Sequence, residues 1–384
     1  MRIGIDCRTI LNPDKGEEAG IGHYTYQLVR HLLEINKSDT FVLFFDRSVE
    51  DRRLKKFDKE NVETKFFPFI KYERFMPDRY TDFLISATIK SKKLDVFFSP
   101  IPRIPKSYNG KSVVTVHDLS MLRFPDLFSQ KELSKLKTQI PESLKKAEKI
   151  ITVSQFTADE VNKHFNISLK RIQVIENGVD QRFFSEVPAS QIKSLKKDYN
   201  IKGDYILFLG TIDPRKNIAR LLDAYEYFRK SLSGTKKNYK LVIAGAKGAK
   251  TAQIERKIKF SDFKKDIYVP GYIPAKDLGP LFKGASLFVF PSLYEGFGIP
   301  PLEAMAKGVP TIVSNITPIK EVVGEDILKF NPKNSTDMAK TMDKVLTNKS
   351  NRKEIVKKGK KIAKKFSWGK CAKKTFKLLQ KIAN

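Results

Sequence analysis

The sequence predicts an α/β protein with two domains, each built on a parallel β-sheet. Short apolar runs alternate with stretches of helical periodicity in residues 2–175, and a second alternation of the same kind starts at residue 205. Each series opens with a strand that leads into a glycine-containing loop. The length of 384 residues suits two domains of ordinary size, and 41% hydrophobic residues are enough to fill two cores.

The first series contains short apolar runs that are rich in β-branched and aromatic residues, as buried parallel strands are. The expected strands span residues 2–6, 40–45, 63–67, 95–99, 112–116, 149–153 and 172–175. A helix is expected over 23–34, directly after the loop that contains Gly20 and Gly22. Ser154 is expected to cap the helix that follows the strand at 149–153, because its hydroxyl can accept a backbone N–H bond.

The second series follows a break near residue 180. Residues 183–203, with a turn and a polar helix, are interpreted as the linker. Beyond it we expect a helix over 218–232 and strands at 205–209, 239–244, 266–269, 285–290 and 311–314.

Cysteine content and hydropathy favour a cytoplasmic protein. The two cysteines, Cys7 and Cys371, provide neither a disulfide framework nor a zinc pattern. The N-terminus runs directly into the strand at 2–6, so no secretory leader is expected. No apolar run approaches the roughly 20 residues of a membrane-spanning helix.

The net charge of +30 favours an anionic partner. Residues 344–384 contain 15 basic residues and one acid, Glu354. Nucleic acid, anionic lipid and phosphorylated substrates all fit this balance, and charge alone does not choose among them. Residues 71–93 interleave apolar side chains with Lys and Arg, which fits either a helix on an anionic membrane surface or an ordinary amphipathic helix packed on the sheet.

Residues 294–310 indicate a binding site at the start of a helix. Two glycines, Gly296 and Gly298, allow close approach to a ligand, and the paired prolines at 300–301 suit a first helical turn. Gly308 is expected just past the helix end. Glu295 would lie in the loop and Glu303 in the first helical turn, where backbone N–H groups favour an anion.

Residues 210–217, Gly-Thr-Ile-Asp-Pro-Arg-Lys-Asn, indicate an anion site after the first strand of the second domain. Arg215 offers a bidentate fork and Lys216 a point charge, a pair suited to a diphosphate. Cations at a helix start are otherwise unfavourable against the helix dipole. Two other strand ends carry candidate groups, with His117 and Asp118 after the strand at 112–116, and Gly271 to Ile273 after the strand at 266–269.

These motifs together resemble the retaining family 4 glycosyltransferases of the GT-B fold. The two acids, eight positions apart, lie in EGFGIPPLEAMAKGVP, and GTIDPRKN precedes them. The resemblance also covers GIG at 20–22, VHD at 116–118, NGVD at 177–180 and FSW at 366–368. It therefore extends over essentially the whole chain.

The resemblance implies two facing Rossmann-like domains with a nucleotide-sugar in the cleft, held mostly by the C-terminal domain. It implies an N-terminal acceptor-side domain over 1–182 and a nucleotide-sugar domain over 183–365. A C-terminal helix over 366–384 would cross back to the first domain.

The same resemblance implies roles for residues of the second domain. Glu303 would bind the ribose hydroxyls and Glu295 the hydroxyls of the donor sugar. Arg215 and Lys216, after the turn at Gly210, would clamp the diphosphate. The remaining donor contacts would come largely through the backbone of Phe297, Gly298 and Ile299 at the sugar and phosphates, and of Tyr272 and Ile273 at the base.

From the first domain, Gly20 and Gly22 would assist the diphosphate clamp, and His117 would lie beside the sugar near its C6. Many family members carry Arg directly after the glycine of the loop at 210, where this chain has Thr211, and we expect Arg215 to supply that charge. Glu295, His117, Arg215 and Lys216 are the predicted catalytic residues, and neither a metal nor a cofactor is expected.

The PRKN variant resembles bacterial mannosyltransferases, which makes GDP-mannose the first expected donor and a UDP-hexose the second. The acceptor would be lipid-linked or a growing surface polysaccharide, with contact at the inner face of the membrane. Transfer would retain the anomeric configuration, and the leaving phosphate would help to deprotonate the acceptor.

Two alternatives stay open at this point. A sugar-nucleotide epimerase of the same architecture would need an acid/base constellation that the sequence lacks. A basic nucleic-acid-binding protein would fit the charge, but no nucleic-acid module is recognisable, and we expect no nucleic-acid partner. A retaining glycosidase needs two carboxylates about 5–5.5 Å apart, which a loop residue and a helix residue eight positions apart need not provide.

Overall fold

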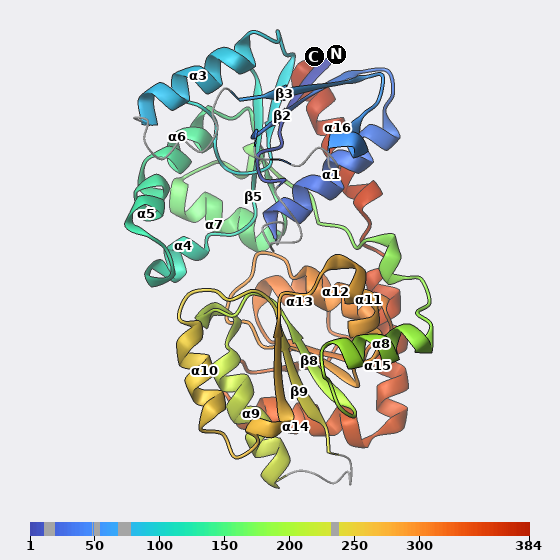
Figure 1. The fold of residues 1–384 in the computed structure, drawn as a ribbon. Coiled ribbons are helices and arrows are strands. Elements are labelled where there is room, and N and C mark those ends of the chain that lie inside the picture. The colour runs from blue at the N-terminus through green and yellow to red at the C-terminus, as the bar shows by residue number, and fades with distance from the viewer. Residues whose placement is uncertain (11–19, 48, 50–53, 68–77, 232–237) are drawn as a thin grey trace. The chain divides into compact units, whose positions relative to one another are not determined.

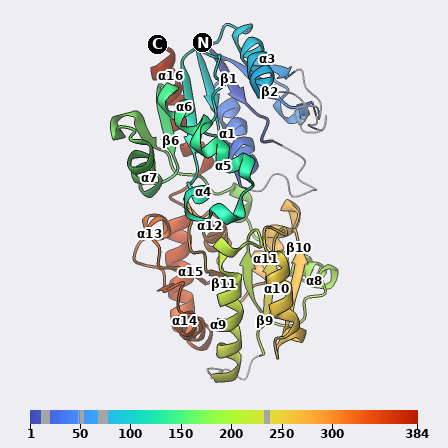
Figure 2. The same cartoon turned by 90° about the vertical axis from the view of Figure 1, so that its left-hand side faces the viewer.

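The computed structural model describes residues 1–384 except 11–19, 48, 50–53, 68–77 and 232–237. The chain forms two compact units, unit 1 with Met1–Gly178 and Trp368–Asn384, and unit 2 with Val179–Ser367. Each unit is a parallel sheet with helices on both faces (Figures 1 and 2). The chain thus passes between units after residues 178 and 367, where the sequence predicted breaks after residues 182 and 365.

The sheet of unit 1 has the strand order β3-β2-β1-β4-β5-β6-β7, and the described strand pairs are parallel. All strands expected in this half are present, with ends that differ by no more than one residue. Their bounds are β1 (Arg2–Asp6), β2 (Thr40–Phe45), β3 (Val62–Phe66), β4 (Val96–Ser99), β5 (Ser112–Val116), β6 (Lys149–Thr152) and β7 (Ile172–Val174).

The helices of unit 1 include the last helix of the chain. They are α1 (Ile21–Ile35), α3 (Asp78–Lys90), α4 (Ser120–Arg123), α5 (Gln130–Lys137), α6 (Gln139–Lys146), α7 (Gln155–Phe165) and α16 (Trp368–Ala383), with 3₁₀ turns η2 (Lys55–Phe57), η4 (Pro125–Leu127) and η5 (Leu169–Arg171). Helix α16 packs beside α1 and reaches β4. The Ser154 hydroxyl accepts the Thr157 N–H at 3.1 Å, which confirms the predicted cap of α7.

The helix expected over 71–93 is α3 in part, and residues 71–77 lie outside the described chain. Ile85 and Ile89 are buried in the core of unit 1, whereas Tyr80 and Phe83 are exposed. The described part of this segment is therefore an amphipathic helix that packs on the sheet.

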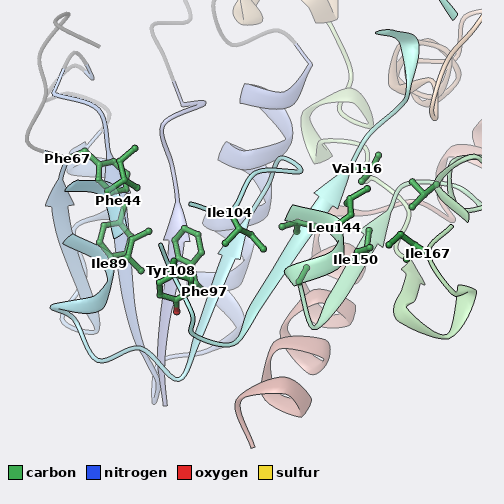
Figure 3. Packing of buried hydrophobic residues seen from close by; sticks show 14 of the residues in the cluster. Phe44, Phe67, Ile89, Phe97, Ile104, Tyr108, Val116, Leu144, Ile150 and Ile167 are labelled. Atoms are coloured by element: carbon green, nitrogen blue, oxygen red, sulfur yellow. The ribbon is translucent and has the colours of Figure 1, made fainter. Parts of the chain in front are cut away.

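Aliphatic and aromatic side chains fill the core between the sheet of unit 1 and the helices on one of its faces (Figure 3). Phe44 of β2 stacks on Phe67 with ring centroids 5.5 Å apart, and Phe97 of β4 contacts Tyr108 at 5.5 Å. Ile150 of β6 and Leu144 of α6 extend this core along the sheet. Burial of such side chains contributes about 1.5–3 kcal/mol each, which explains why β5 places Val114 and Val116 in this core.

The sheet of unit 2 has the order β10-β9-β8-β11-β12-β13, again with parallel pairs. Its strands are β8 (Tyr205–Leu209), β9 (Lys240–Ala244), β10 (Ile267–Gly271), β11 (Leu287–Phe290), β12 (Thr311–Ser314) and β13 (Lys329–Phe330). Strand β13 was not predicted, because a two-residue edge strand leaves no periodic pattern in the sequence.

The helices of unit 2 cover both faces of this sheet (Figures 1 and 2). They are α8 (Ala189–Asp198), α9 (Ile218–Ser231), α10 (Thr251–Lys259), α11 (Ala275–Lys283), α12 (Ile299–Ala306), α13 (Thr317–Val323), α14 (Ser335–Thr347) and α15 (Lys349–Ala363), with 3₁₀ turns η6 (Gln181–Phe183), η7 (Pro214–Lys216) and η8 (Lys264–Asp266).

The interpretation of 183–203 as a linker is wrong, because this segment packs as part of unit 2. Phe183 is fully buried and meets the ring of Phe282 at 5.8 Å. The Tyr199 hydroxyl donates to Asp277 of α11 at 2.9 Å. Helix α8 packs against α11 and buries Leu195, a contact that the polar composition of this helix does not reveal.

Both sheets reverse their strand order at a defined position, between β1 and β4 in unit 1 and between β8 and β11 in unit 2. In open parallel sheets the loops at the carboxyl ends of such neighbouring strands diverge, and ligands bind between them. The loops after β8 and β11 are therefore the first place to look for a site in unit 2. Among the helices described, none is both long and apolar enough to cross a membrane.

Gly245 directly follows β9 and is expected to be essential for the close approach of this loop to the backbone of Gly210. Its φ is +145°, and a Cβ there would lie 1.9 Å from the carbonyl oxygen of Gly210. We expect Gly245→Ala to lower the free energy of unfolding by about 3 kcal/mol or more, through backbone strain and this clash. Gly203→Ala is the matched control, with a φ of +77° and open space around it, and should lose only about 1 kcal/mol. Equal losses in denaturant unfolding would contradict the packing role.

Candidate functional site

The loops after β8 and β11 lie side by side at the carboxyl edge of the sheet of unit 2. The backbone N–H of Leu293 donates to the carbonyl of Arg215 at 2.8 Å. The side chain of Asn217 donates to the carbonyl of Pro291 at 3.0 Å. These contacts join the loop that contains Arg215 and Lys216 to the loop that contains Glu295.

A buried ion cluster occupies the junction of these loops. The Lys216 ammonium lies 2.5 Å from Glu295 Oε1, and Arg215 Nη1 lies 3.4 Å from Glu295 Oε2. Arg215 Nη2 also lies 3.7 Å from Asp213. Glu295 and Lys216 are only 7% and 8% exposed, so their mutual attraction is weakly screened by water. Charges at this depth need close partners, because removing them from water is costly.

The local sequence explains how Lys216 reaches Glu295. The carboxylate of Asp213 caps the short turn η7 by accepting the N–H of Lys216 at 3.2 Å. The lysine side chain then passes Gly210, where a Cβ would lie 3.7 Å from its Cε. Its ammonium lies 5.4 Å from the ring centroid of Phe290, a cation–π contact at the end of β11.

Helix α12 begins as the sequence predicted. Gly298 precedes it with a φ of +102°, and both prolines at 300–301 fall in its first turn. Gly308 follows the helix end with a φ of +77°. Gly298 is required here because an added Cβ would lie 2.6 Å from Ile319 Cδ1 in a backbone region that disfavours side chains.

The sequence predicted Glu303 in the first turn of α12, and this prediction is wrong. The helix begins at Ile299, which places Glu303 in the second turn, and its side chain is buried with 6% exposure. Burial raises the pKa of Glu303 to about 7, with Arg182 opposing this shift and Asp180 reinforcing it. Glu303 is thus a buried carboxyl group that titrates near neutrality, a property typical of functional sites.

Other predicted donor-binding residues lie on the same edge of unit 2. Tyr272 and Ile273 directly follow β10, and Ile273 is buried. Phe297 is buried and meets the ring of Phe366 edge-on at 5.6 Å. The side chain of Phe297 therefore packs in the core of unit 2. A ligand would contact the backbone of Phe297 to Ile299 instead.

His117 and the glycines of the first loop belong to unit 1. His117 directly follows β5, and its Nε2 lies 2.8 Å from the carbonyl oxygen of Pro100. A carbonyl only accepts, so Nε2 carries the proton, and Nδ1 of the neutral ring is an acceptor. Burial lowers the pKa of His117, opposed by the bond to Pro100 and by the charge of Asp118. The ring of Tyr24 meets the imidazole edge-on at 4.6 Å.

Gly20 and Gly22 open α1. Gly20 has a φ of +66° and precedes the helix, and Gly22 is buried in its first turn. Residues 11–19 of the same loop lie outside the described chain. The carboxylate of Asp118 accepts the backbone N–H of Ser120, the first residue of α4, at 2.8 Å.

The structure thus gathers Glu295, Arg215 and Lys216 into one cluster beside Gly210, within unit 2. Sequence reasoning missed the supporting residues Asp213 and Asn217, although both lie in the quoted motif GTIDPRKN. An Asp before Pro-Arg-Lys is a recognisable cap of a short turn and would have indicated the first of them. Among the described residues no group of three or more His, Cys, Asp or Glu is arranged to hold a metal ion.

Two family models match parts of the chain that overlap at residues 174–183. The model described as Glycosyltransferase Family 4 matches residues 19–183. The model described as Glycosyl transferases group 1 matches residues 174–362, which include the cluster in unit 2.

Curated relatives and solved structures agree with these matches. O-antigen chain mannosyltransferase B of Escherichia coli is 29% identical over 372 residues, 94% of this chain and 96% of the relative. Serotype-specific mannosyltransferase WbdA of Escherichia coli is 35% identical over 59% of this chain, which spans only 28% of WbdA. The crystal structure of Anabaena HepE in complex with UDP and glucose has a TM-score of 0.76 at 16% identity, covering 99% of this chain and 100% of that one. The chain, with its two parallel α/β units, has the GT-B fold.

Glu303 is expected to make stability depend on pH. Its pKa is about 7 in the folded protein, against an ordinary value of 4.5, so folding favours the protonated form. The stabilisation is complete below the ordinary pKa and is lost as pH rises through 7, by at most about 3 kcal/mol.

Denaturant unfolding at about pH 5 and about pH 8 measures this loss. Glu303→Gln should remove most of the difference between the two conditions. Glu186→Gln, at a side chain that is 85% exposed, should leave the difference unchanged. An unaltered pH difference in Glu303→Gln would show that another group causes it.

Proposed function

Because the chain is a glycosyltransferase of the GT-B fold, we propose that it transfers mannose from GDP-mannose to an acceptor hydroxyl with retention of configuration. The acceptor in this proposal is a growing surface polysaccharide or a lipid-linked saccharide at the inner face of the membrane. This proposal is supported by the relative named O-antigen chain mannosyltransferase B, which aligns with this chain over 96% of its own length. WbdA, also named a mannosyltransferase, supports the same donor sugar.

The cluster of Arg215, Lys216 and Glu295 is the observation that carries this proposal. Departure of a nucleoside diphosphate builds negative charge on the leaving phosphate, and preorganised cations at a buried site stabilise it. Lys216 is held in place by Glu295 and by the turn at Asp213, so it needs little reorganisation during the reaction. The cluster lies where the strand order of unit 2 reverses, the usual ligand position in such sheets.

Glu295 has two roles in this proposal. Its carboxylate orients the ammonium of Lys216 and the guanidinium of Arg215 toward the diphosphate. An incoming diphosphate competes for the same two cations and leaves carboxylate lone pairs for hydroxyls of the donor sugar. The negative charge also favours the positive charge that develops on the sugar ring.

Glu303 is proposed to bind the ribose of the donor. A buried carboxylate accepts hydrogen bonds from two vicinal hydroxyls and regains part of the solvation that it lost on folding. Ribose binding should therefore lower the raised pKa of Glu303.

Unit 1 is proposed to contact the donor sugar through His117 and to take part in binding the acceptor. His117 has a fixed tautomer, set by the carbonyl of Pro100, and offers Nδ1 as an acceptor to a sugar hydroxyl. The leaving phosphate, rather than a protein carboxylate, is proposed to take the proton of the acceptor hydroxyl. Retention follows when the acceptor attacks from the face that the phosphate leaves.

A donor panel tests the substrate. Purified protein with GDP-mannose and a polysaccharide or lipid-linked saccharide acceptor should release GDP and form an α-mannoside on that acceptor, detected by mass spectrometry and by the anomeric NMR signal. UDP-hexoses are the second donor class, supported by HepE, which was solved with UDP and glucose. Turnover of UDP-hexoses alone would overturn GDP-mannose as donor, and a β-mannoside would overturn retention.

Substitutions in the cluster test the assignment of the site. We expect Glu295→Gln and Lys216→Met each to reduce kcat/KM at least about 100-fold, because each removes a charge that acts at the diphosphate or sugar. Lys230→Ala, which breaks an exposed ion pair with Asp262, is the control and should keep full activity. Thermal unfolding verifies that the variants fold. Wild-type turnover in both cluster variants would remove the site assignment.

A further inference from the structure

We propose that Asn217 is a positioning residue that fixes Arg215 and Lys216 for the diphosphate by joining three loops of unit 2. This inference rests on the proposed function, because it concerns the same diphosphate site. Asn217 carries no charge, and no role was predicted for it from the sequence. Its contacts make it the central support of the cluster.

The side chain of Asn217 uses all of its amide groups. Nδ2 donates to the carbonyl of Pro291 at 3.0 Å, in the loop after β11, and to the carbonyl of Pro332 at 2.7 Å, in the loop after β13. Oδ1 accepts from Nη1 of Arg220 at 3.1 Å. With 3% exposure, Asn217 supplies partners to two carbonyls that would be costly to leave unpaired.

The backbone of Asn217 is equally specific. Its φ of +61° and ψ of +30° are left-handed, a conformation that Asn and Gly tolerate better than other residues. Its N–H donates to the carbonyl of Pro214 at 3.0 Å, which closes η7, and its carbonyl accepts from Leu221 at 3.2 Å, at the start of α9. Asn217 is therefore the point at which the turn of Lys216 becomes a long helix.

These contacts hold the two cations from both directions. On one side, the carbonyl of Arg215 accepts the N–H of Leu293 at 2.8 Å. On the other side, the amide of Asn217 donates to the carbonyl of Pro291. Residues 215–217 and 291–293 are therefore joined by two hydrogen bonds, one at each end of the two segments. Lysine has a flexible side chain, so the position of its ammonium depends on a fixed backbone as well as on the ion pair with Glu295. The contact between Lys216 and Glu295 depends on this support.

Asn217 contributes its amide hydrogen bonds and its left-handed backbone, and different substitutions separate these two contributions. Glycine keeps the left-handed backbone but removes the amide. Aspartate keeps a similar shape, but its carboxylate cannot donate to the carbonyls of Pro291 and Pro332. Arg220→Ala removes the partner of Oδ1 and leaves both Nδ2 bonds intact, so it is the matched control.

The test compares the affinities of each full-length variant for GDP and for guanosine, with UDP and uridine as a second pair. We expect Asn217→Gly to weaken GDP binding about tenfold or more and to change guanosine binding less than twofold, because only the diphosphate meets the displaced cations. Asn217→Asp should behave similarly, and Arg220→Ala should resemble the wild type. An equal loss for GDP and guanosine would mean a general structural role and would overturn the inference.

A double-mutant cycle verifies that Asn217 acts through Lys216. If it does, Asn217→Gly in a Lys216→Met background should weaken GDP binding by less than about twofold beyond Lys216→Met alone. The inference concerns GDP affinity alone, so the two substitutions need not be coupled in thermal stability. Full additivity in GDP affinity would overturn the inference.

Hydrogen exchange tests the support itself without a ligand. We expect faster exchange in peptides over 213–217 and 291–295 for Asn217→Gly, with wild-type exchange in Arg220→Ala. Unchanged exchange in both peptides would overturn the inference. A wild-type protein that binds neither GDP nor UDP would instead overturn the proposed function, and with it the diphosphate role of Asn217. That result is read from the wild type alone, so the two failures are distinguishable.

Discussion

The ion pair between Lys216 and Glu295 is the interaction on which the site of unit 2 depends. Both groups are almost completely buried, and a buried charge without a close partner destabilises the folded state by several kcal/mol. The loops that carry them must therefore be held in register. Asp213 caps the turn of Lys216, Leu293 bonds to the loop of Arg215, and Asn217 joins both loops to a third. The number of hydrogen bonds that hold the loops around Lys216 follows from the free-energy cost of burying its charge.

The sheet decides where this cluster lies. Strands β8 and β11 are neighbours in space although α9, α10, α11 and the strands β9 and β10 separate them in sequence. Their loops meet at the edge where the strand order reverses. Gly245 allows the end of β9 to approach the backbone of Gly210 at this edge. A parallel sheet buried on both faces thus supplies a rigid base, and the chemistry is left to the loops.

Helix α12 links the site to the segment that enters unit 2. It carries Glu303 in its second turn and ends at Ala306. The next residue is Lys307, whose ammonium donates to the carbonyls of Arg182 at 2.9 Å and Ser185 at 2.7 Å. Burial lowers the pKa of Lys307, as expected for an ammonium whose partners are neutral carbonyls. Arg182 and Asp180 of the same segment also act on the charge of Glu303. One short helix therefore connects a titrating carboxyl group to the first residues of the unit.

The sequence by itself determined the fold class, most strand bounds and the identity of the charged residues, because strand periodicity, glycine turns and paired prolines are local signals. It also predicted the start and end of α12 and the cap at Ser154. Only the tertiary structure decided that residues 183–203 pack on α11, that Glu303 is buried with a raised pKa, and that Asn217 supports the cations. Each of these depends on contacts between segments far apart in the chain. Residues 217 and 332 meet because the sheet brings the ends of their strands together, and no pattern along the sequence encodes that distance.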